Sequence, residues 1–86
     1  MSQDHERIRA FLIEEANWDG SPEELTDDLP LIEQHVIDSM LLLRLVAWLE
    51  SEYAITIGDA DVVPENFSSI DRIAGFVAAR RAETGD

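Results

Sequence analysis

The segment from residue 38 to residue 53 constrains the fold most, because its apolar side chains recur with the period of an α-helix. They stand at the i, i+3, i+4, i+7 and i+11 positions of one stripe: Leu42, Leu45, Val46, Leu49 and Tyr53. A helix with such a stripe is stable only when the stripe is buried against other parts of the chain. Asp38 and Ser39 are residue types that favour a helix start. We therefore expect a helix that begins at these two residues and turns the stripe toward the core.

A first helix is predicted over residues 4–16. Ile8, Leu12 and Ala16 fall on one helical face, and Phe11 lies beside it. Residues 17–20 contain Asn and Gly, which are typical helix-stop signals.

Residues 17–37 then form a long connection. Such a length is uncommon in a small domain unless the loop is functional or holds some structure of its own. Ser21 and Glu24 have the spacing of a capping box, with Pro22 at the first helical position, so a short turn is expected there. Apolar residues spaced along the connection can pin it to the helices: Leu25, Leu29, Leu31, Ile32, Val36 and Ile37.

Residues 54–57 alternate weakly between apolar and polar, as a strand does. A lone strand has no pairing partner in this sequence, so we predict an extended connector instead. Asp59 can cap a short helix through about residue 63, which Pro64 would close.

A last helix is predicted after Ser68, its expected N-cap, with Asp71 in the first turn. One face of it carries Ile70, Ile73, Ala74, Val77 and Arg81. The predicted fold class is all-α: a small four-helix bundle with three main helices, one short helix and a long first loop. Residues 1–86 would form a single domain.

Length and composition exclude several kinds of function. A chain of 86 residues buries only a small core and leaves little room for a deep pocket, so a self-contained enzyme is not expected. The absence of cysteine excludes disulfides, zinc–thiolate sites and cysteine nucleophiles, so any thiol chemistry would need a cofactor. His5 and His35 are the only histidines, and neither has the spacing of a metal site.

The chain is strongly acidic. Its net charge is −13, with 19 acidic residues against six basic ones, all of them Arg. Such a surface repels nucleic acid and anionic membranes and favours partners with basic faces; the alternative is that the acids serve solubility alone. The apolar runs are too short to span a membrane, and the polar N-terminus is not that of a signal peptide. We therefore expect a cytoplasmic monomer with no nucleic-acid or membrane partner.

Ser39 is the candidate for covalent modification. It places a hydroxyl at a helix start directly after a long exposed loop, where free N–H groups and a partial positive charge favour a phosphodiester. Asp38 could hold the local turn or help to position the metal of a modifying enzyme. Taken alone, the Asp-Ser pair is typical of ordinary helix capping and gives little support for modification.

The helix that follows adds a second feature. If its core stripe is centred on Leu42, then four residues point largely away from the core: Met40, Leu43, Arg44 and Ala47. We call these four residues the docking strip. An exposed apolar strip indicates a partner surface, unless the neighbouring loop covers it.

In this order, the elements resemble the acyl carrier and peptidyl carrier protein family from about residue 6 to residue 80. The family's attachment motif is usually Gly-x-Asp-Ser-Leu. Asp38, Ser39 and Met40 match its last three positions, and Val36 replaces its Gly. The resemblance implies a free-standing, non-catalytic carrier with 4′-phosphopantetheine on Ser39 and an acyl or aminoacyl thioester on that arm. It also implies a phosphopantetheinyl transferase, a loading enzyme and downstream synthase or tailoring enzymes as partners.

A second departure concerns the acids that similar fatty-acid carriers usually bear along the exposed side of this helix. Leu41 and Arg44 stand in those places here. This difference favours a carrier of a specialised polyketide or nonribosomal-peptide pathway. The alternative is an acidic helical interaction module without a cofactor. The residues present in the chain nearly exclude a third possibility, a small hydrolase or metal-dependent enzyme.

Overall fold

Four α-helices and two short 3₁₀ turns follow one another in the computed structural model, which describes residues 3–16, 18 and 20–83. The elements are α1 (Gln3–Glu15), η1 (Pro22–Glu24), α2 (Ser39–Tyr53), η2 (Asp59–Asp61), α3 (Pro64–Phe67) and α4 (Ile70–Glu83). No strand occurs among the described residues. The all-α prediction, with three main helices, one short helix and a long first loop, is confirmed.

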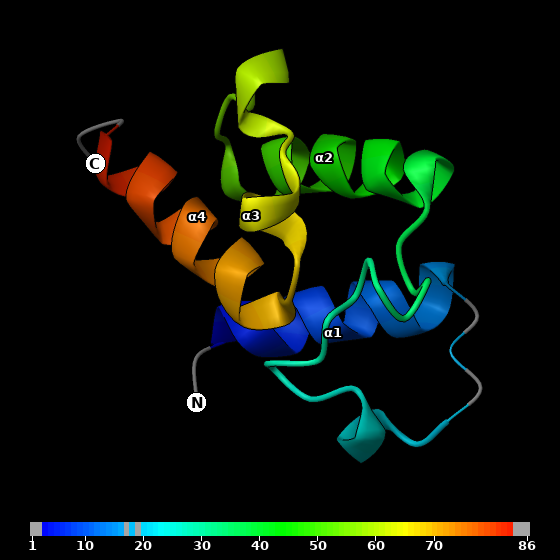
Figure 1. Cartoon of the computed structure of the whole chain (residues 1–86). Coiled ribbons are helices and arrows are strands. Elements are labelled where there is room, and N and C mark those ends of the chain that lie inside the picture. The colour runs from blue at the N-terminus through cyan, green and yellow to red at the C-terminus, as the bar shows by residue number, and fades with distance from the viewer. Residues whose placement is uncertain (1–2, 17, 19, 84–86) are drawn as a thin grey trace.

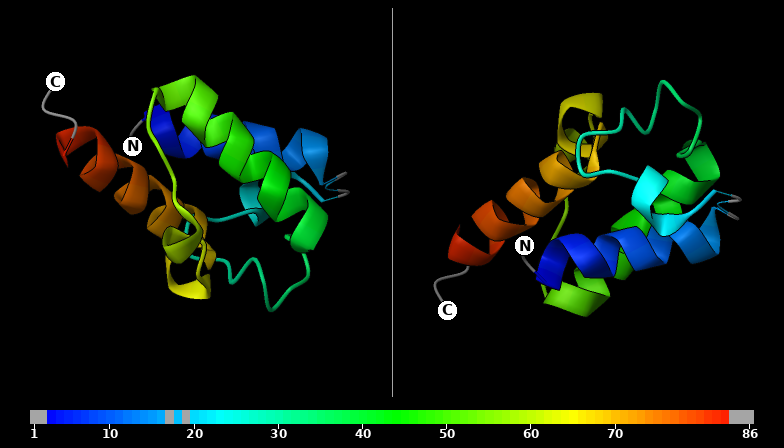
Figure 2. Two further views of the ribbon diagram at one scale, coloured as in Figure 1. Left: turned by 90° about the horizontal axis from the view of Figure 1, so that it is seen from above. Right: turned by 90° about the horizontal axis from the view of Figure 1, so that it is seen from below.

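The main helices are arranged around one core. α1 and α2 run in opposite directions (Figure 1), and the views from above and below show that they cross obliquely (Figure 2). α4 packs against α1, α2 and α3. None of the described helices is both long and apolar enough to cross a lipid bilayer.

The predicted apolar faces of α1 and α4 form much of the core. Ile8 and Leu12 of α1 are fully buried, and the buried residues of α4 are Ile70, Ile73, Ala74 and Val77. Arg81, which the helical period places on the same face of α4, is exposed instead. Its guanidinium carbon lies 5.7 Å from the centre of the Tyr53 ring.

The buried face of α2 differs from the predicted stripe by about one position. Leu41, Leu45, Leu49 and Tyr53 are the buried residues, whereas Leu42 and Val46 are half-buried at the edge of the core. The expectation that Leu41 lies on the exposed side is therefore wrong, since only 6% of its surface is exposed. Residues 40–43 are all apolar, so the pattern there predicts a helix without fixing which side faces inward.

The connector after α2 is extended over residues 55–57, as predicted, whereas Ala54 has a left-handed conformation and caps the end of α2. Ile55 and Ile57 are buried and Thr56 between them is exposed, which is the alternation of an extended chain on an apolar surface. The next turn is shorter than predicted: η2 follows Gly58 and ends at Asp61.

Two predictions about the start of the last helices are wrong. Pro64 opens α3 rather than closing the preceding turn, because the fixed φ of Pro suits a first helical position. The cap of α4 is Ser69 rather than Ser68, since the Ser69 hydroxyl accepts a hydrogen bond from the Arg72 N–H at 3.1 Å.

The first loop contains the predicted turn and is pinned by apolar residues. The Ser21 N–H donates to Glu24 Oε1 at 3.2 Å, which is one half of the predicted capping box. Leu25, Leu31 and Ile37 are buried. The helix-stop signals at residues 17 and 19 lie outside the described residues.

Candidate functional site

Asp38 and Ser39, which are adjacent at the start of α2, have different structural roles. The backbone of Asp38 is extended, with φ −106° and ψ −175°, and its Oδ1 accepts a hydrogen bond from the Leu41 N–H at 2.8 Å. Its carbonyl accepts the first intrahelical hydrogen bond, from the Leu42 N–H at 2.9 Å. Asp38 is therefore the N-cap, and Ser39 is the first residue inside the helix.

Because Asp38 caps the helix, the Ser39 hydroxyl is not needed for this purpose. Ser39 is exposed, and within the described part of the chain its hydroxyl takes part in no hydrogen bond. The first N–H groups of a helix have no intrahelical acceptor, and they carry the positive end of the helix dipole. A phosphate ester on Ser39 Oγ would lie at this end, so the local residues fit a phosphate-linked group.

The loop approaches Ser39 through a tight turn. His35 adopts the left-handed backbone conformation, with φ 60°. The Leu31 carbonyl then accepts hydrogen bonds from the N–H groups of Val36, at 2.8 Å, and Ile37, at 3.3 Å. The Leu31 N–H in turn donates to the Ser68 carbonyl at 2.7 Å, which ties the turn to the start of α4.

This turn explains why Val36 can occupy the place of a Gly in the motif. Among the described residues, only His35 and Ala54 combine a side chain with a positive φ. Val36 therefore has an ordinary backbone conformation and needs no glycine-like freedom. The left-handed position falls one residue earlier.

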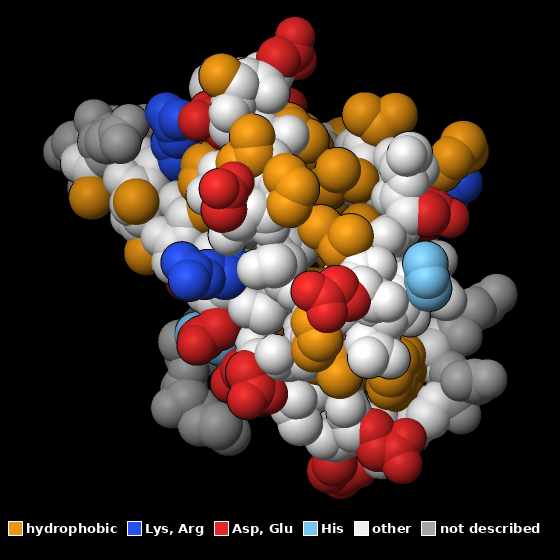
Figure 3. All heavy atoms as spheres, viewed as in Figure 1, with side chains coloured by type: hydrophobic (Ala, Val, Ile, Leu, Met, Phe, Trp, Pro, Cys, Tyr) orange, Lys and Arg blue, Asp and Glu red, His pale blue; other side chains and the backbone are white. Residues whose placement is uncertain are grey.

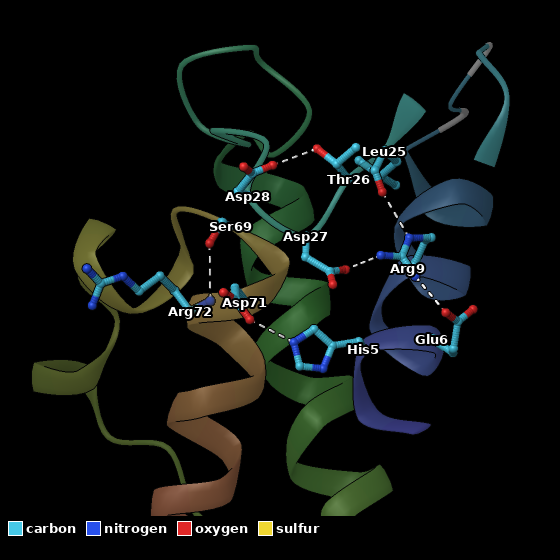
Figure 4. A network of polar contacts seen from close by, with 10 residues as sticks. All are labelled: His5, Glu6, Arg9, Leu25, Thr26, Asp27, Asp28, Ser69, Asp71 and Arg72. Carbon is cyan, nitrogen blue, oxygen red and sulfur yellow. Dashed lines mark hydrogen bonds and ion pairs between the residues drawn. The ribbon is translucent and has the colours of Figure 1, made fainter. Parts of the chain in front are cut away.

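A polar network anchors the middle of the loop to two helices (Figure 4). Arg9 of α1 donates from Nε to the Leu25 carbonyl at 2.9 Å, and its Nη2 pairs with the Asp27 carboxylate. The Asp27 carbonyl accepts from the Asp71 N–H at 2.9 Å, and the Asp71 carboxylate contacts His5 Nε2 at 2.8 Å. The loop is thus held between α1 and the first turn of α4. Arg9 was not predicted as a functional residue, although it is a base of α1 that contacts this acid-rich loop.

The docking strip is exposed beside Ser39. Met40 and Leu43 are 66% and 70% exposed, and they are the large hydrophobic residues of the described chain that are exposed to this extent. Ala47 and Arg44 are also exposed, so the first loop does not cover these four residues. Figure 3 shows hydrophobic side chains gathered over α2 and the connector to α3.

Two titratable groups of the described chain have a shifted pKa, and both lie outside the site around Ser39. In the part of the chain that the structure describes, no group of three or more His, Asp or Glu residues could hold a metal ion. The backbone N–H of Gly58 and the Arg80 guanidinium lower the pKa of Asp61. Burial raises the pKa of the Tyr53 phenol. Neither of these groups belongs to the turn before Ser39 or to the docking strip.

Comparison with known proteins identifies the family. The family model described as "Phosphopantetheine attachment site" matches residues 6–77, which include the loop, Ser39 and the docking strip. A protein of Serratia sp. (strain ATCC 39006) named "Probable acyl carrier protein PigG" is 30% identical over 64 residues, which are 74% of each chain. Both matches agree with the all-helical fold. The chain therefore belongs to the phosphopantetheine attachment-site family, and it is a carrier protein whose cofactor is a covalently attached 4′-phosphopantetheine.

Proposed function

We propose that Ser39 carries the phosphopantetheine arm and that the chain is a non-catalytic carrier of an acyl or aminoacyl group. One observation carries this proposal: Ser39 is an exposed hydroxyl at the first position of α2, and Asp38 does the capping in its place. Ser39 also lies inside the region that the family model matches.

The chemistry of the cargo belongs to the arm, and the chain's own residues hold the arm in place. When bound, phosphopantetheine supplies a terminal thiol that can hold an acyl group as a thioester, and the chain has no cysteine that could do so. The N-terminus of α2 stabilises the negative charge of the phosphodiester. Asp38 keeps the first turn of the helix formed, and the turn at residues 31–37 fixes where that helix begins.

A carrier needs enzymes that attach the arm, load it and receive the cargo. We propose that these partners are a phosphopantetheinyl transferase, an acyl- or aminoacyl-loading enzyme and downstream synthase or tailoring enzymes. They would approach over the docking strip, which begins directly after Ser39. A cytoplasmic location, a monomeric state and a single domain over residues 1–86 stay predictions.

The pathway is the finer part of the proposal. Leu41 is buried, so its apolar character serves the core and says nothing about recognition. Arg44 supports the argument, because it places an exposed base where an acidic recognition helix would carry an acid. We therefore propose a specialised polyketide or nonribosomal-peptide pathway.

The attachment site can be tested with two serines of the same helix. Ser51 is also exposed on α2 but lies in its last turns, so Ser51→Ala is a matched control for Ser39→Ala. Each variant is co-expressed with phosphopantetheinyl transferases, and its intact mass and peptide map are measured. We expect the wild type and Ser51→Ala to gain the arm and Ser39→Ala to remain unmodified but folded.

Two outcomes would contradict the proposal. An arm found on another serine would refute the assignment of Ser39. A wild-type chain that stayed unmodified with every transferase would favour an interaction module without a cofactor.

A further inference from the structure

The charge of the docking strip has the opposite sign to that of the whole protein. The chain carries a net charge of −13, yet no acid occurs between Ser39 and Leu49, and Arg44 is the one charged residue in that stretch. Ser39 is only five residues from Arg44, or about 7.5 Å along the helix axis. This distance is within the screening length of about 8 Å at physiological salt. A protein that covers Ser39 and the docking strip therefore meets the positive charge of Arg44 within that strip, whereas the exposed Asp38 precedes Ser39 and lies outside the strip.

Arg44 has hydrogen-bonding capacity left for a partner. Its side chain is 61% exposed, and its Nη1 lies 3.3 Å from Glu15 Oε1 at the end of α1. An exposed ion pair of this kind contributes little to stability, so it can be exchanged or shared readily. A guanidinium has five N–H donors in a fixed fork. Within the described residues, this contact uses one of them. The other donors can bind a second carboxylate with two parallel hydrogen bonds.

The neighbours of Arg44 decide what such a partner must look like. Met40 and Ala47 are its i−4 and i+3 neighbours on the helix surface, and Leu43 lies beside it. A purely apolar partner would strip water from the guanidinium without replacing its hydrogen bonds, which is costly. A basic residue of the partner at this point would add repulsion between like charges.

We propose that the phosphopantetheinyl transferase of this chain presents an apolar contact surface with an Asp or Glu carboxylate placed to bind Arg44. The inference concerns the transferase because that enzyme must reach Ser39 Oγ itself, whereas later enzymes can meet the far end of the arm. It rests on the proposed function, since it requires Ser39 to be the attachment residue. The many acids elsewhere on the chain act at longer range and steer the encounter rather than form this contact.

Arg7 provides a matched control for Arg44. It is 50% exposed and forms the same kind of ion pair between α1 and α2, with its Nη1 3.1 Å from Glu52 Oε2. Glu52 lies 13 residues beyond Ser39, or about 20 Å along the helix axis. Arg44→Glu and Arg7→Glu thus change the net charge equally and break similar pairs, but the two pairs lie at different distances from Ser39 along α2.

The first measurement is the affinity of these variants for the transferase that modifies the wild-type chain. We expect Arg44→Glu to raise Kd at least about tenfold and Arg7→Glu to raise it less than about twofold. Circular dichroism checks that both variants remain helical. Equal Kd values for the two variants would overturn the proposal.

The second measurement uses the absence of lysine from the chain. Arg44→Lys introduces a single side-chain amine, which a carbodiimide couples to any carboxylate in contact with it. We expect an amide to an Asp or Glu of the transferase, found by peptide mapping, and no such product from Arg7→Lys. An internal amide to Glu15 is removed by Glu15→Gln, and peptide mapping separates products of the N-terminal amine.

The two proposals fail in different ways. If both lysine variants cross-link to the transferase equally, or neither does, the carboxylate is absent and this inference falls. The mass measurement on Ser39→Ala is unaffected by that result, so the proposed function would stand.

Discussion

Replacing Asp38 by Ala should destabilise the protein, whereas replacing Ser39 by Ala should not. The Asp38 carboxylate accepts from the Leu41 N–H at 2.8 Å, and the loss of such a cap costs about 1 kcal/mol, within a range of about 0.5–2. In a domain of this size, about 1 kcal/mol lowers Tm by about 4–8 °C. Ser39 is exposed and its hydroxyl has no partner in the described chain, so Ser39→Ala should stay within about 0.5 kcal/mol of the wild type.

Asp38→Asn separates the cap from the charge. Asn is as good an N-cap as Asp, so this variant keeps the hydrogen bond and loses only the interaction with the helix dipole, about 0.3–1 kcal/mol. Thermal and denaturant unfolding of the apo forms should therefore rank Asp38→Ala as the least stable, followed by Asp38→Asn and then Ser39→Ala. If Ser39→Ala lost as much stability as Asp38→Ala, the division of tasks between cap and attachment site would be refuted.

Two further predictions concern the core and the response to acid. Leu45 is fully buried, so Leu45→Ala should lower the free energy of unfolding by about 2–5 kcal/mol in denaturant unfolding. Leu43 is 70% exposed, so Leu43→Ala should lower it by less than about 0.5 kcal/mol. A similar loss for both variants would show that the assignment of the buried face of α2 is wrong. Hydrogen bonds from the Gly58 N–H and Arg80 lower the pKa of Asp61 in the folded protein. Their contribution to stability is therefore fully present above the unfolded-state pKa of Asp, which is about 3.9. It is lost as the pH falls through the lower pKa that Asp61 has in the folded state. Asp61→Asn should therefore be less stable than the wild type near neutral pH, and this difference should shrink below about pH 4; a difference that is constant with pH would contradict the assignment.

The elements of this fold are predictable from short-range signals, but the rotation of α2 is not. The period of residues 38–53 gives the helix and nearly its bounds. The side of α2 that faces the core depends on which of its residues the connector and α4 cover, and those contacts are made only in the folded chain. A run of four apolar residues before Arg44 leaves the choice open. Leu41 is buried because of this packing.

The helix caps show a similar limit. Asp38-Ser39 and Ser68-Ser69 each offer two adjacent side chains that could cap a helix. The cap is the residue whose backbone is still extended while its carbonyl already accepts an intrahelical bond. In the first pair the extended residue is the first one, Asp38, and in the second pair the second residue, Ser69, accepts the hydrogen bonds of a cap through its hydroxyl and its carbonyl. The residue types alone do not tell which of two adjacent residues is the cap.

The anchoring of the loop by Arg9 could not be predicted from local pattern at all. Its two acceptors in the loop lie 16 and 18 residues away in the sequence, and one of them is a backbone carbonyl, which every residue offers. Only the tertiary structure brings this guanidinium, 15% exposed, to the loop. The anchor matters for the site because the same loop ends at the turn before Ser39.

The order of the two residues at the start of α2 has a physical basis. A side chain at the N-cap reaches back to the N–H groups of the first turn, so whichever residue stands there is occupied by the helix itself. The next side chain is free of this task and projects from the positive end of the dipole. With the order reversed, the hydroxyl would be held as the cap and the carboxylate would occupy the exposed position. The helix would survive, but its free group would be an anion unable to accept a phosphodiester-linked arm. The sequence Asp38-Ser39 keeps the helix start formed and the hydroxyl available at the same time.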